Sequence, residues 1–292
     1  MAIGEIGLTS SMRSNLISLQ TTARLLGTTE ERLSTGKRVN TAVDNPANFF
    51  AAQGHNSRAN LLTGLKDNIS EAIQTVKSAD SGIKGVLTSI EALRGIVTQA
   101  RSAINDTVNS ATVLSGLEGQ YNRMVEQLNN LVTDASYKGT NFLTSGSVTL
   151  TVNFNENATT KIVMSGFNGG ASGLAISGGG GALTVAGTSG NMSSGSMDSV
   201  SELNAIEATL NTAIATLQTK ASELAANLNT LTARQTFITE MVNTLIVGAT
   251  KLTEADTNEE GANLLSLQTK QQLGTTALSI SSQAEQSVLR LF

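Results

Sequence analysis

The sequence predicts a mainly α-helical protein: an elongated coiled-coil helical bundle with a small β-rich insertion and paired terminal helices. Two observations lead to this fold class. Apolar residues recur every seven residues over long stretches, which is typical of helices that pack lengthwise on one another. Aromatic residues make up only 3% of the 292 residues and Trp is absent. This supply suits packed amphipathic helices better than a thick globular core.

The longest heptad row lies in the C-terminal half of the chain. Its members are Leu203, Leu210, Leu217, Leu224, Leu231, Ile238, Leu245 and Leu252. A second row, four residues further on, holds Ile214, Ala221, Leu228 and Val242. Asp198 or Ser199 can accept a hydrogen bond from the first-turn amides, and Glu202 follows in the first turn, so we expect the helix to begin there.

Two further apolar rows precede the insertion. The first is Leu62, Ile69, Val76, Ile83, Ile90, Val97 and Ile104. The second is Leu114, Leu117, Tyr121, Met124, Leu128 and Leu131. Each row occupies one helical face, so three helices can shield one another's apolar stripes in a bundle. We expect this bundle domain to comprise 45–143 and 199–252.

The segment 144–198 has a different character. Val148, Leu150, Val152 and Phe154 alternate with other residues, which predicts a strand. The stretch NENATT then indicates a turn, TKIVM a second strand, and weaker apolar pieces, GLAIS and ALTVA, flank a GGGG run. We interpret the segment as a small β-rich surface insertion with flexible loops, at the far end of the bundle where the chain reverses.

The two ends of the chain share one pattern. Each end carries a row of apolar residues at alternating spacings of four and three. The N-terminal row is Met12, Leu16, Leu19, Ala23, Leu26 and Leu33. The C-terminal row is Leu273, Ala277, Ile280, Ala284 and Leu291. A polar linker at 34–48 follows the N-terminal row, and another at 253–261 precedes the C-terminal row. Pro46, in the first linker, can open a new helix. We expect a terminal-helix domain of 1–44 and 253–292.

A terminal helix with an apolar stripe is not stable alone, so its stripe packs on the other terminus, the bundle or another copy of the chain. Periodicity by itself leaves an intramolecular coiled coil open. The polar positions carry Gln, Asn, Ser and Thr more than Glu and Lys. Neutral side chains avoid the desolvation cost of charge among close neighbours, which favours intermolecular assembly.

The sequence predicts no enzyme and no catalytic, cofactor-binding or metal site. There is no Cys, His55 is the single histidine, and the GGGG run is not followed by a Lys-Ser/Thr pair. A net charge of −4 argues against nucleic acid as a partner. No apolar run is long enough for a membrane span, and the N-terminal MAIGEIGLTSSMRSN lacks the basic and apolar regions of a cleaved signal peptide.

Two segments resemble bacterial flagellins. LSTGKRVNTAVDNPANFFAAQ at 33–53 is similar to their N-terminal linker, and the run from ADTNEEG to SVLRLF at 255–292 is similar to their C-terminal signature. The segments agree in order and at the correct ends, while 144–198 is the part that varies among flagellins. The resemblance implies a structural subunit that self-assembles into the flagellar filament for swimming motility, of a compact type with a short variable region.

Two alternatives remain. A hook–filament junction protein shares the terminal pattern but diverges in the segment that matches here at 255–292. A non-flagellar coiled-coil scaffold would share the heptads. It does not need disordered termini, whereas the resemblance to flagellins implies that both termini of this chain are disordered in the free monomer.

The resemblance also implies an architecture and partners. Terminal helices pair as an inner core, linkers form spokes, the helical bundle forms an outer core and the insertion faces solvent. The implied partners are other copies of the chain, an export chaperone on the C-terminal helix, and the filament cap and hook-junction proteins. Subunits would leave the cell by flagellar type III export, without a cleaved signal peptide, and reside in the extracellular filament.

By position, the inner-core contacts would be Leu16, Leu19, Leu26, Leu33, Leu264, Leu273, Ile280, Val288, Leu291 and Phe292. The matching spoke residues would be Arg32, Lys37, Arg38, Asp44 and Asn45, which we expect to set subunit register through polar contacts.

Many flagellins are detected by a Toll-like receptor through a segment like LQRVRELAVQ, where this chain has IEALRGIVTQ at 90–99. Arg94 matches the second Arg of that segment, but Ala92 replaces the first and Gly95 replaces the Glu. Alanine cannot supply the donors of a lost guanidinium. Our hypothesis is therefore weak or absent receptor activation.

Overall fold

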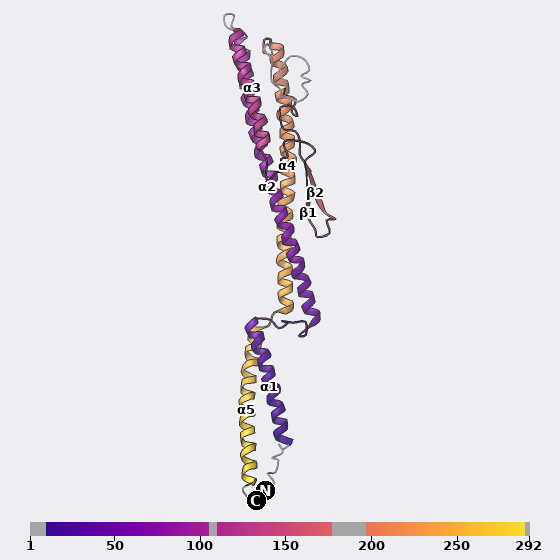
Figure 1. The fold of residues 1–292 in the computed structure, drawn as a ribbon, viewed down its shortest axis with the longest axis vertical. Helices are drawn as coiled ribbons and strands as arrows, with labels where there is room; N and C mark the ends of the chain where they lie inside the picture. The colour runs from indigo at the N-terminus through magenta and orange to yellow at the C-terminus, as the bar shows by residue number, and fades with distance from the viewer. Residues whose placement is uncertain (1–9, 105–109, 177–196, 290–292) are drawn as a thin grey trace. The chain divides into compact units, whose positions relative to one another are not determined.

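The computed structural model describes residues 10–104, 110–176 and 197–289 (Figure 1). Within these ranges the chain is mainly α-helical, with five helices and one two-stranded sheet, as the heptad pattern predicts. In chain order the elements are α1 Ser10–Thr35, α2 Pro46–Ala103, α3 Ser110–Asp134, β1 Thr149–Asn153, β2 Lys161–Ser165, α4 Val200–Thr253 and α5 Thr257–Leu289. None of the described helices is both long and apolar enough to cross a bilayer.

The chain divides into two compact units, Met1–Asn60 with Val242–Phe292, and Leu61–Met241. We call them the terminal unit and the bundle unit. The helices α2 and α4 contribute to both units, because each continues through the boundary. The domain boundaries expected from the sequence stay a prediction.

In the bundle unit, the heptad residues of α2 and α4 form the core. The predicted members with no solvent exposure are Ile69, Ile83, Ile90, Leu203, Leu210, Leu217 and Leu231. The second α4 row is only half-buried at Ile214, Ala221 and Leu228. The helices therefore share one fully buried seam, and the second row covers its edge.

The buried row of α3 differs from the prediction at two positions. Val125 and Val132 are buried, whereas the expected Met124 and Leu131 are half-buried. Leu131 nevertheless contacts α2, where it covers Gly85. A β-carbon at Gly85 would lie 2.8 Å from the Leu131 Cδ2 atom. The face of α3 that is most deeply buried therefore carries the valines, one position after the expected Met124 and Leu131.

The helix α4 begins with a capping box. The Ser199 hydroxyl accepts a hydrogen bond from the Glu202 amide at 3.2 Å, and the Glu202 carboxylate accepts one from the Ser199 amide at 3.1 Å. Each side chain satisfies a backbone donor that the first helical turn leaves unpaired. Of the two predicted caps, Ser199 is the one used.

The two predicted strands pair as an antiparallel hairpin with Leu150 opposite Met164 and Val152 opposite Ile162. The described part of the piece GLAIS, residues 173–176, is not a strand: it lies in and after a turn, with Leu174 and Ile176 buried. ALTVA and the GGGG run lie outside the described residues.

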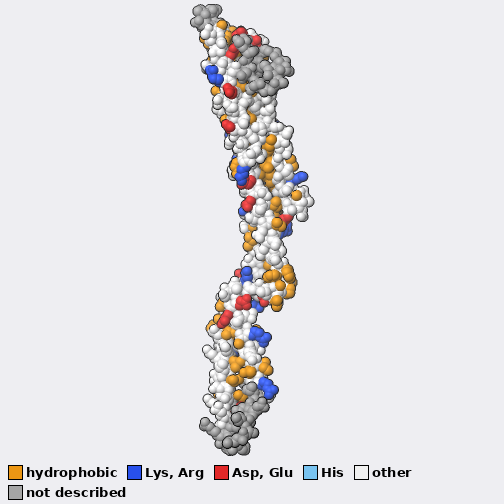
Figure 2. All heavy atoms as spheres, viewed as in Figure 1, with side chains coloured by type: hydrophobic (Ala, Val, Ile, Leu, Met, Phe, Trp, Pro, Cys, Tyr) orange, Lys and Arg blue, Asp and Glu red, His pale blue; other side chains and the backbone are white. Residues whose placement is uncertain are grey.

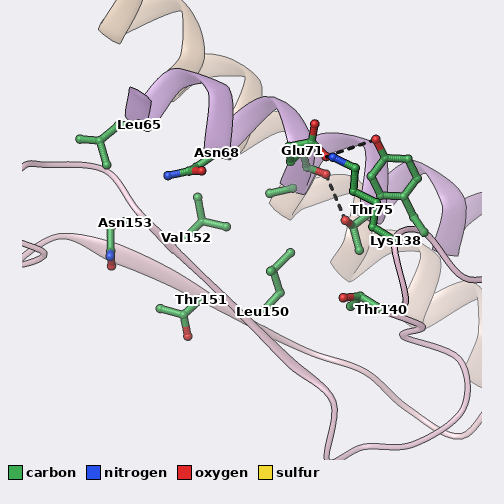
Figure 3. Close-up of a pocket in the computed structure, with 12 residues that line it drawn as sticks. Leu65, Asn68, Glu71, Thr75, Lys138, Thr140, Leu150, Thr151, Val152 and Asn153 are labelled. Carbon is green, nitrogen blue, oxygen red and sulfur yellow. Dashed lines mark hydrogen bonds and ion pairs between the residues drawn. The ribbon is translucent and has the colours of Figure 1, made fainter. Parts of the chain in front are cut away.

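The expected position at the far end of the bundle is wrong for the hairpin of the insertion. The hairpin lies beside the bundle: β1 faces Leu65–Thr75 of α2 across a cleft, and β2 faces Lys220–Asn227 of α4 (Figures 1 and 3). The guanidinium of Arg234 on α4 lies 5.1 Å from the centre of the Phe154 ring, which follows β1. The insertion starts here because α3 has only 25 residues against 58 in α2, so its C-terminus falls partway along the longer helix.

Candidate assembly surface

The helices α1 and α5 pack against each other in the terminal unit (Figure 1). At the contact, Leu19 of α1 covers Gly274 of α5, where a β-carbon would lie 2.7 Å from the Leu19 Cδ2 atom. The buried side chains of α1 are Met12, Thr22 and Thr29. The hydroxyl of Thr22 donates to the Ser18 carbonyl at 2.9 Å, so its burial needs no partner on α5. The pair is thus joined by small and polar residues as well as apolar ones.

The predicted inner-core residues fall into three groups. Leu19, Leu26 and Leu264 are half-buried in the helix pair. Exposed positions are Leu16, Leu33, Leu273 and Ile280, the last two with 65% and 62% of their surface open. The side chain of Val288, together with Leu291 and Phe292, lies outside the described residues.

The apolar stripe of α5 therefore does not face α1. Leu265, Leu273 and Ile280 point to solvent, as do Ile17 and Leu25 of α1. Figure 2 shows hydrophobic side chains open on the surface of this unit. A hydrophobic stripe left open along both helices is typical of a surface that another molecule covers.

The two linkers pair with each other through their backbones. The amides of Arg38 and Val39 donate to the Thr253 carbonyl at 2.7 and 3.2 Å, and the Ala255 amide donates to the Gly36 carbonyl at 3.0 Å. Gly36 has a φ of 66°, a left-handed conformation that ends α1 and favours glycine. The sequence shows each linker as a polar stretch but not that they form one bridge.

One ion pair reinforces this bridge. The Arg32 guanidinium lies 3.2 Å from the Glu260 carboxylate, whose side chain is only 9% exposed. Arg32 lies in the last turn of α1 and Glu260 in the first turn of α5, so the pair joins the helices next to the linkers. Glu260 was not among the predicted contacts, and only its place in an acidic first turn hinted at a role.

Asp44 and Asn45 shape the turn that leads into α2. The Asp44 carboxylate accepts hydrogen bonds from the amides of Asn40 and Thr41 at 3.0 and 2.9 Å. These bonds lower the pKa of Asp44, because they stabilise its charged form. Asn45 caps α2 by accepting from the Asn48 amide at 3.1 Å, and the helix begins at Pro46.

The five predicted spoke residues thus fall into two groups, those with contacts in the chain and those whose side chains are exposed. Arg32, Asp44 and Asn45 make the contacts within the chain described above. The side chains of Lys37 and Arg38 are exposed and form no ion pair within the part of the chain that the structure describes. A role for any of the five in subunit register stays a prediction.

The receptor-like segment lies on α2. Ala92 and Gly95 are exposed, and a β-carbon at Gly95 would meet no atom within 4 Å. The Arg94 guanidinium lies 3.3 Å from the Glu91 carboxylate one turn earlier. This neighbour partly neutralises the one guanidinium that the segment retains.

The cleft between β1 and α2 offers little for binding chemistry (Figure 3). Its two charged groups, Glu71 and Lys138, lie 2.7 Å apart and neutralise each other. The Glu71 carboxylate also accepts from the Tyr137 hydroxyl at 3.2 Å. Lys138 lowers the pKa of Glu71, and Glu71 raises that of Lys138. Within the described residues, no group of three His, Cys, Asp or Glu side chains could hold a metal ion.

Comparison with known proteins gives consistent results. The model of the bacterial flagellin N-terminal helical region matches residues 7–149, and that of the C-terminal helical region matches residues 208–292. Flagellin FljO of Caulobacter vibrioides is 28% identical, with all of both chains covered. A flagellin of Brucella melitensis is 27% identical over 97% of each chain, and Flagellin C of Rhizobium meliloti is 27% identical over 91% of this chain and 92% of its own. The chain therefore belongs to the bacterial flagellin family.

Proposed function

We propose that this chain is a structural subunit that self-assembles into the flagellar filament for swimming motility and resides outside the cell. The observation that carries the proposal is the exposed apolar stripe of the terminal helices, above all Leu273 and Ile280. Complete burial of one such side chain is worth about 1.5–3 kcal/mol. Because every copy carries the stripe, many weak contacts add along a filament. The family is a structural one, which supports a non-enzymatic role.

At residue level, we propose that Leu16, Leu33, Leu273 and Ile280 contact neighbouring subunits, whereas Leu19, Leu26 and Leu264 join α1 to α5. The exposure of the first group and the half-burial of the second support this division. Val288, Leu291 and Phe292 belong to the proposed inner core by position alone.

We also propose an export chaperone that covers the C-terminal helix before assembly. Leu265, Leu273 and Ile280 on α5 would supply its apolar contact. Type III export without a cleaved signal peptide, and contacts with cap and hook-junction proteins, complete the proposal. The relatives named above are flagellins, and none of them favours the junction-protein alternative.

For the receptor segment, we propose weak or absent activation of the Toll-like receptor. The support is the loss of one guanidinium at Ala92 and the pairing of Arg94 with Glu91. A reporter-cell assay would contradict this if the chain reached the full potency of active flagellins.

Electron microscopy after seeded polymerisation tests the main proposal. Purified chain with filament seeds should give long tubes of constant width. Persistent monomers under the same conditions would contradict filament formation. Limited proteolysis of the monomer adds a second test: both ends should be lost while a core near 50–250 remains, whereas a preformed coiled-coil scaffold would keep its ends.

A further inference from the structure

The β-hairpin lies flat against the bundle unit, with one face buried and the other open. The side chains of Val152 and Met164 are 4% and 1% exposed, whereas those of Thr151, Val163 and Ser165 are open to solvent. The sheet has only two strands, so each strand has one edge without a partner strand within the described residues. The free edge of a strand presents N–H and C=O groups with which a further strand can pair.

The register of the hairpin shows which backbone groups of β2 form its free edge. At one end of the pair, the Phe154 amide donates to the Thr160 carbonyl at 2.8 Å. At the other end, the Gly166 amide donates to the Val148 carbonyl at 2.7 Å. Hydrogen-bonded and non-bonded pairs alternate in an antiparallel ladder, so the even-numbered residues bond across the hairpin. The N–H and C=O groups that point away from β1 therefore belong to the odd-numbered residues Lys161, Val163 and Ser165.

This free edge of β2 lines a cleft of about 400 Å³ beside α4. On the α4 side, Lys220 and Glu223 lie 2.8 Å apart and neutralise each other. The apolar lining of the cleft includes Phe142, Met164, Phe167 and Leu224. An extended peptide fits such a cleft, because its main chain bonds to the strand edge while every second side chain meets the apolar lining.

Two cations lie at one end of this edge. Lys161 begins β2, and the guanidinium of Arg234 on α4 lies 5.1 Å from the centre of the Phe154 ring. Phe154 is hydrogen-bonded to the residue before Lys161, so both cations are at the same end of the hairpin. Both are exposed, and neither forms an ion pair within the part of the chain that the structure describes. These charges favour a peptide that carries acidic residues.

We propose that the free edge of β2 binds an extended segment of another protein in which apolar and acidic residues alternate. The segment adds to the hairpin as a third strand between β2 and α4. Its apolar side chains face Leu224 and the rest of the lining, and its acidic side chains face solvent near Lys161 and Arg234. This binding does not depend on filament assembly, because the edge is open in the single chain.

A synthetic peptide tests the proposal on the unsubstituted chain. The probe is the heptapeptide Glu-Val-Glu-Leu-Glu-Val-Glu with an N-terminal fluorescein, and fluorescence anisotropy measures its binding to the monomer. Binding should be saturable, and it should weaken about tenfold or more when each Glu of the probe is replaced by Lys.

N-methylation of every second amide of the probe removes the donors on one edge of the bound strand. Two such forms are compared, one methylated at the Glu residues and one at the apolar residues. We expect one of them to lose about tenfold or more in affinity, because its lost donors are those that bond to β2. Retention of affinity by both forms overturns the proposal.

Two proline variants identify the edge that binds. Val163→Pro removes an outward N–H of β2, and Thr151→Pro removes the outward N–H of its cross-strand partner on β1. Proline is tolerated at edge positions whose N–H makes no bond within the sheet. Val163→Pro should weaken binding about tenfold, whereas Thr151→Pro should leave it unchanged. Slow exchange of the Met164 amide in both variants shows that the hairpin persists, and if a variant loses it, the N-methylated probes decide alone.

The remaining outcomes count against the proposal. Failure of the unsubstituted chain to bind the probe overturns it, and so does an equal effect of the two proline substitutions in variants that keep the hairpin. If the unsubstituted chain forms a dimer without peptide and Val163→Pro abolishes that dimer, the edge pairs with a second copy instead. Seeded polymerisation tests the proposed function separately, so failure of either idea can be recognised by itself.

Discussion

Leu19 of α1 lies directly over Gly274 of α5, and this contact sets how the two terminal helices approach each other. A β-carbon at position 274 would come 2.7 Å from the Leu19 Cδ2 atom and 3.0 Å from its Cγ atom. Such distances leave no room for a larger side chain without movement of the leucine or of the helices. An isolated glycine inside a helical pattern is a sequence signal for such close approach.

We expect Gly274→Val to loosen the α1–α5 pair, because overpacking of a close contact costs about 1–3 kcal/mol. Proteolysis of the monomer should then remove the terminal helices faster. Gly27→Val on α1 is the control, since a β-carbon there meets no atom within 4 Å. Adding Leu19→Ala to Gly274→Val should restore much of the lost protection, and failure of both expectations would show that the contact does not govern pairing.

Two glycines of α2, Gly82 and Gly95, should respond in opposite ways to substitution by alanine. A β-carbon at Gly82 would collide with Leu143 and would lie 2.7 Å from the Ala135 β-carbon, which cannot rotate away. Gly82→Ala should therefore destabilise the bundle unit by about 1–3 kcal/mol. Gly95→Ala meets open space and should stabilise it by up to about 1 kcal/mol through helix propensity. Thermal unfolding monitored by circular dichroism measures both changes.

Removal of the Arg32 side chain should weaken the junction between linkers and terminal helices. Arg32→Ala leaves the nearly buried Glu260 carboxylate without its cation. Because Arg32 is one-third exposed, solvent screens the pair, and we expect a loss of about 1–2 kcal/mol in the free energy of unfolding. Denaturant titration measures this loss. Glu260→Gln should cost less, and an equal or larger cost would contradict the assigned cause.

The turn before α2 should respond to acid through Asp44. Its pKa is lowered in the folded chain, so its stabilising contribution is present above the unfolded pKa and is lost as pH falls through the folded value. Amide exchange at Asn40 and Thr41 should therefore accelerate at low pH beyond the intrinsic trend. Asp44→Asn should remove this acid-dependent step, and an unchanged step would assign it to another group.

Truncation of the C-terminus should separate folding from assembly. Removal of residues 281–292 should leave the bundle unit folded, because its core lies between positions 61 and 241. Polymerisation should be abolished, because the proposed inner core loses Val288, Leu291 and Phe292. Circular dichroism and seeded polymerisation together measure the two effects. Normal filament growth would contradict an inner-core role for this segment.

Local patterns in the sequence determined most of the helices and strands. Leucine and isoleucine at seven-residue spacing predicted α2 and α4 and the inward side of each, because the burial of a stripe follows from helical periodicity alone. Ser199 with Glu202 predicted the start of α4, and alternation around Val152 predicted the hairpin. The resemblance of residues 33–53 and 255–292 to flagellin segments predicted the family, since those segments are distinctive in residue order.

Only the tertiary structure decided which faces and segments meet. Periodicity marks Leu273 and Ile280 as the apolar stripe of α5, yet α5 contacts α1 at Gly274 instead. The sequence of α5 alone cannot show this, because the close approach that glycine permits depends on both helices. Arg32 and Glu260, which join α1 to α5 beside the linkers, are 228 positions apart, and no local pattern can indicate such a pair. The hairpin lies beside the bundle because α3 ends partway along α2, a consequence of relative helix length and packing that the strand pattern does not contain.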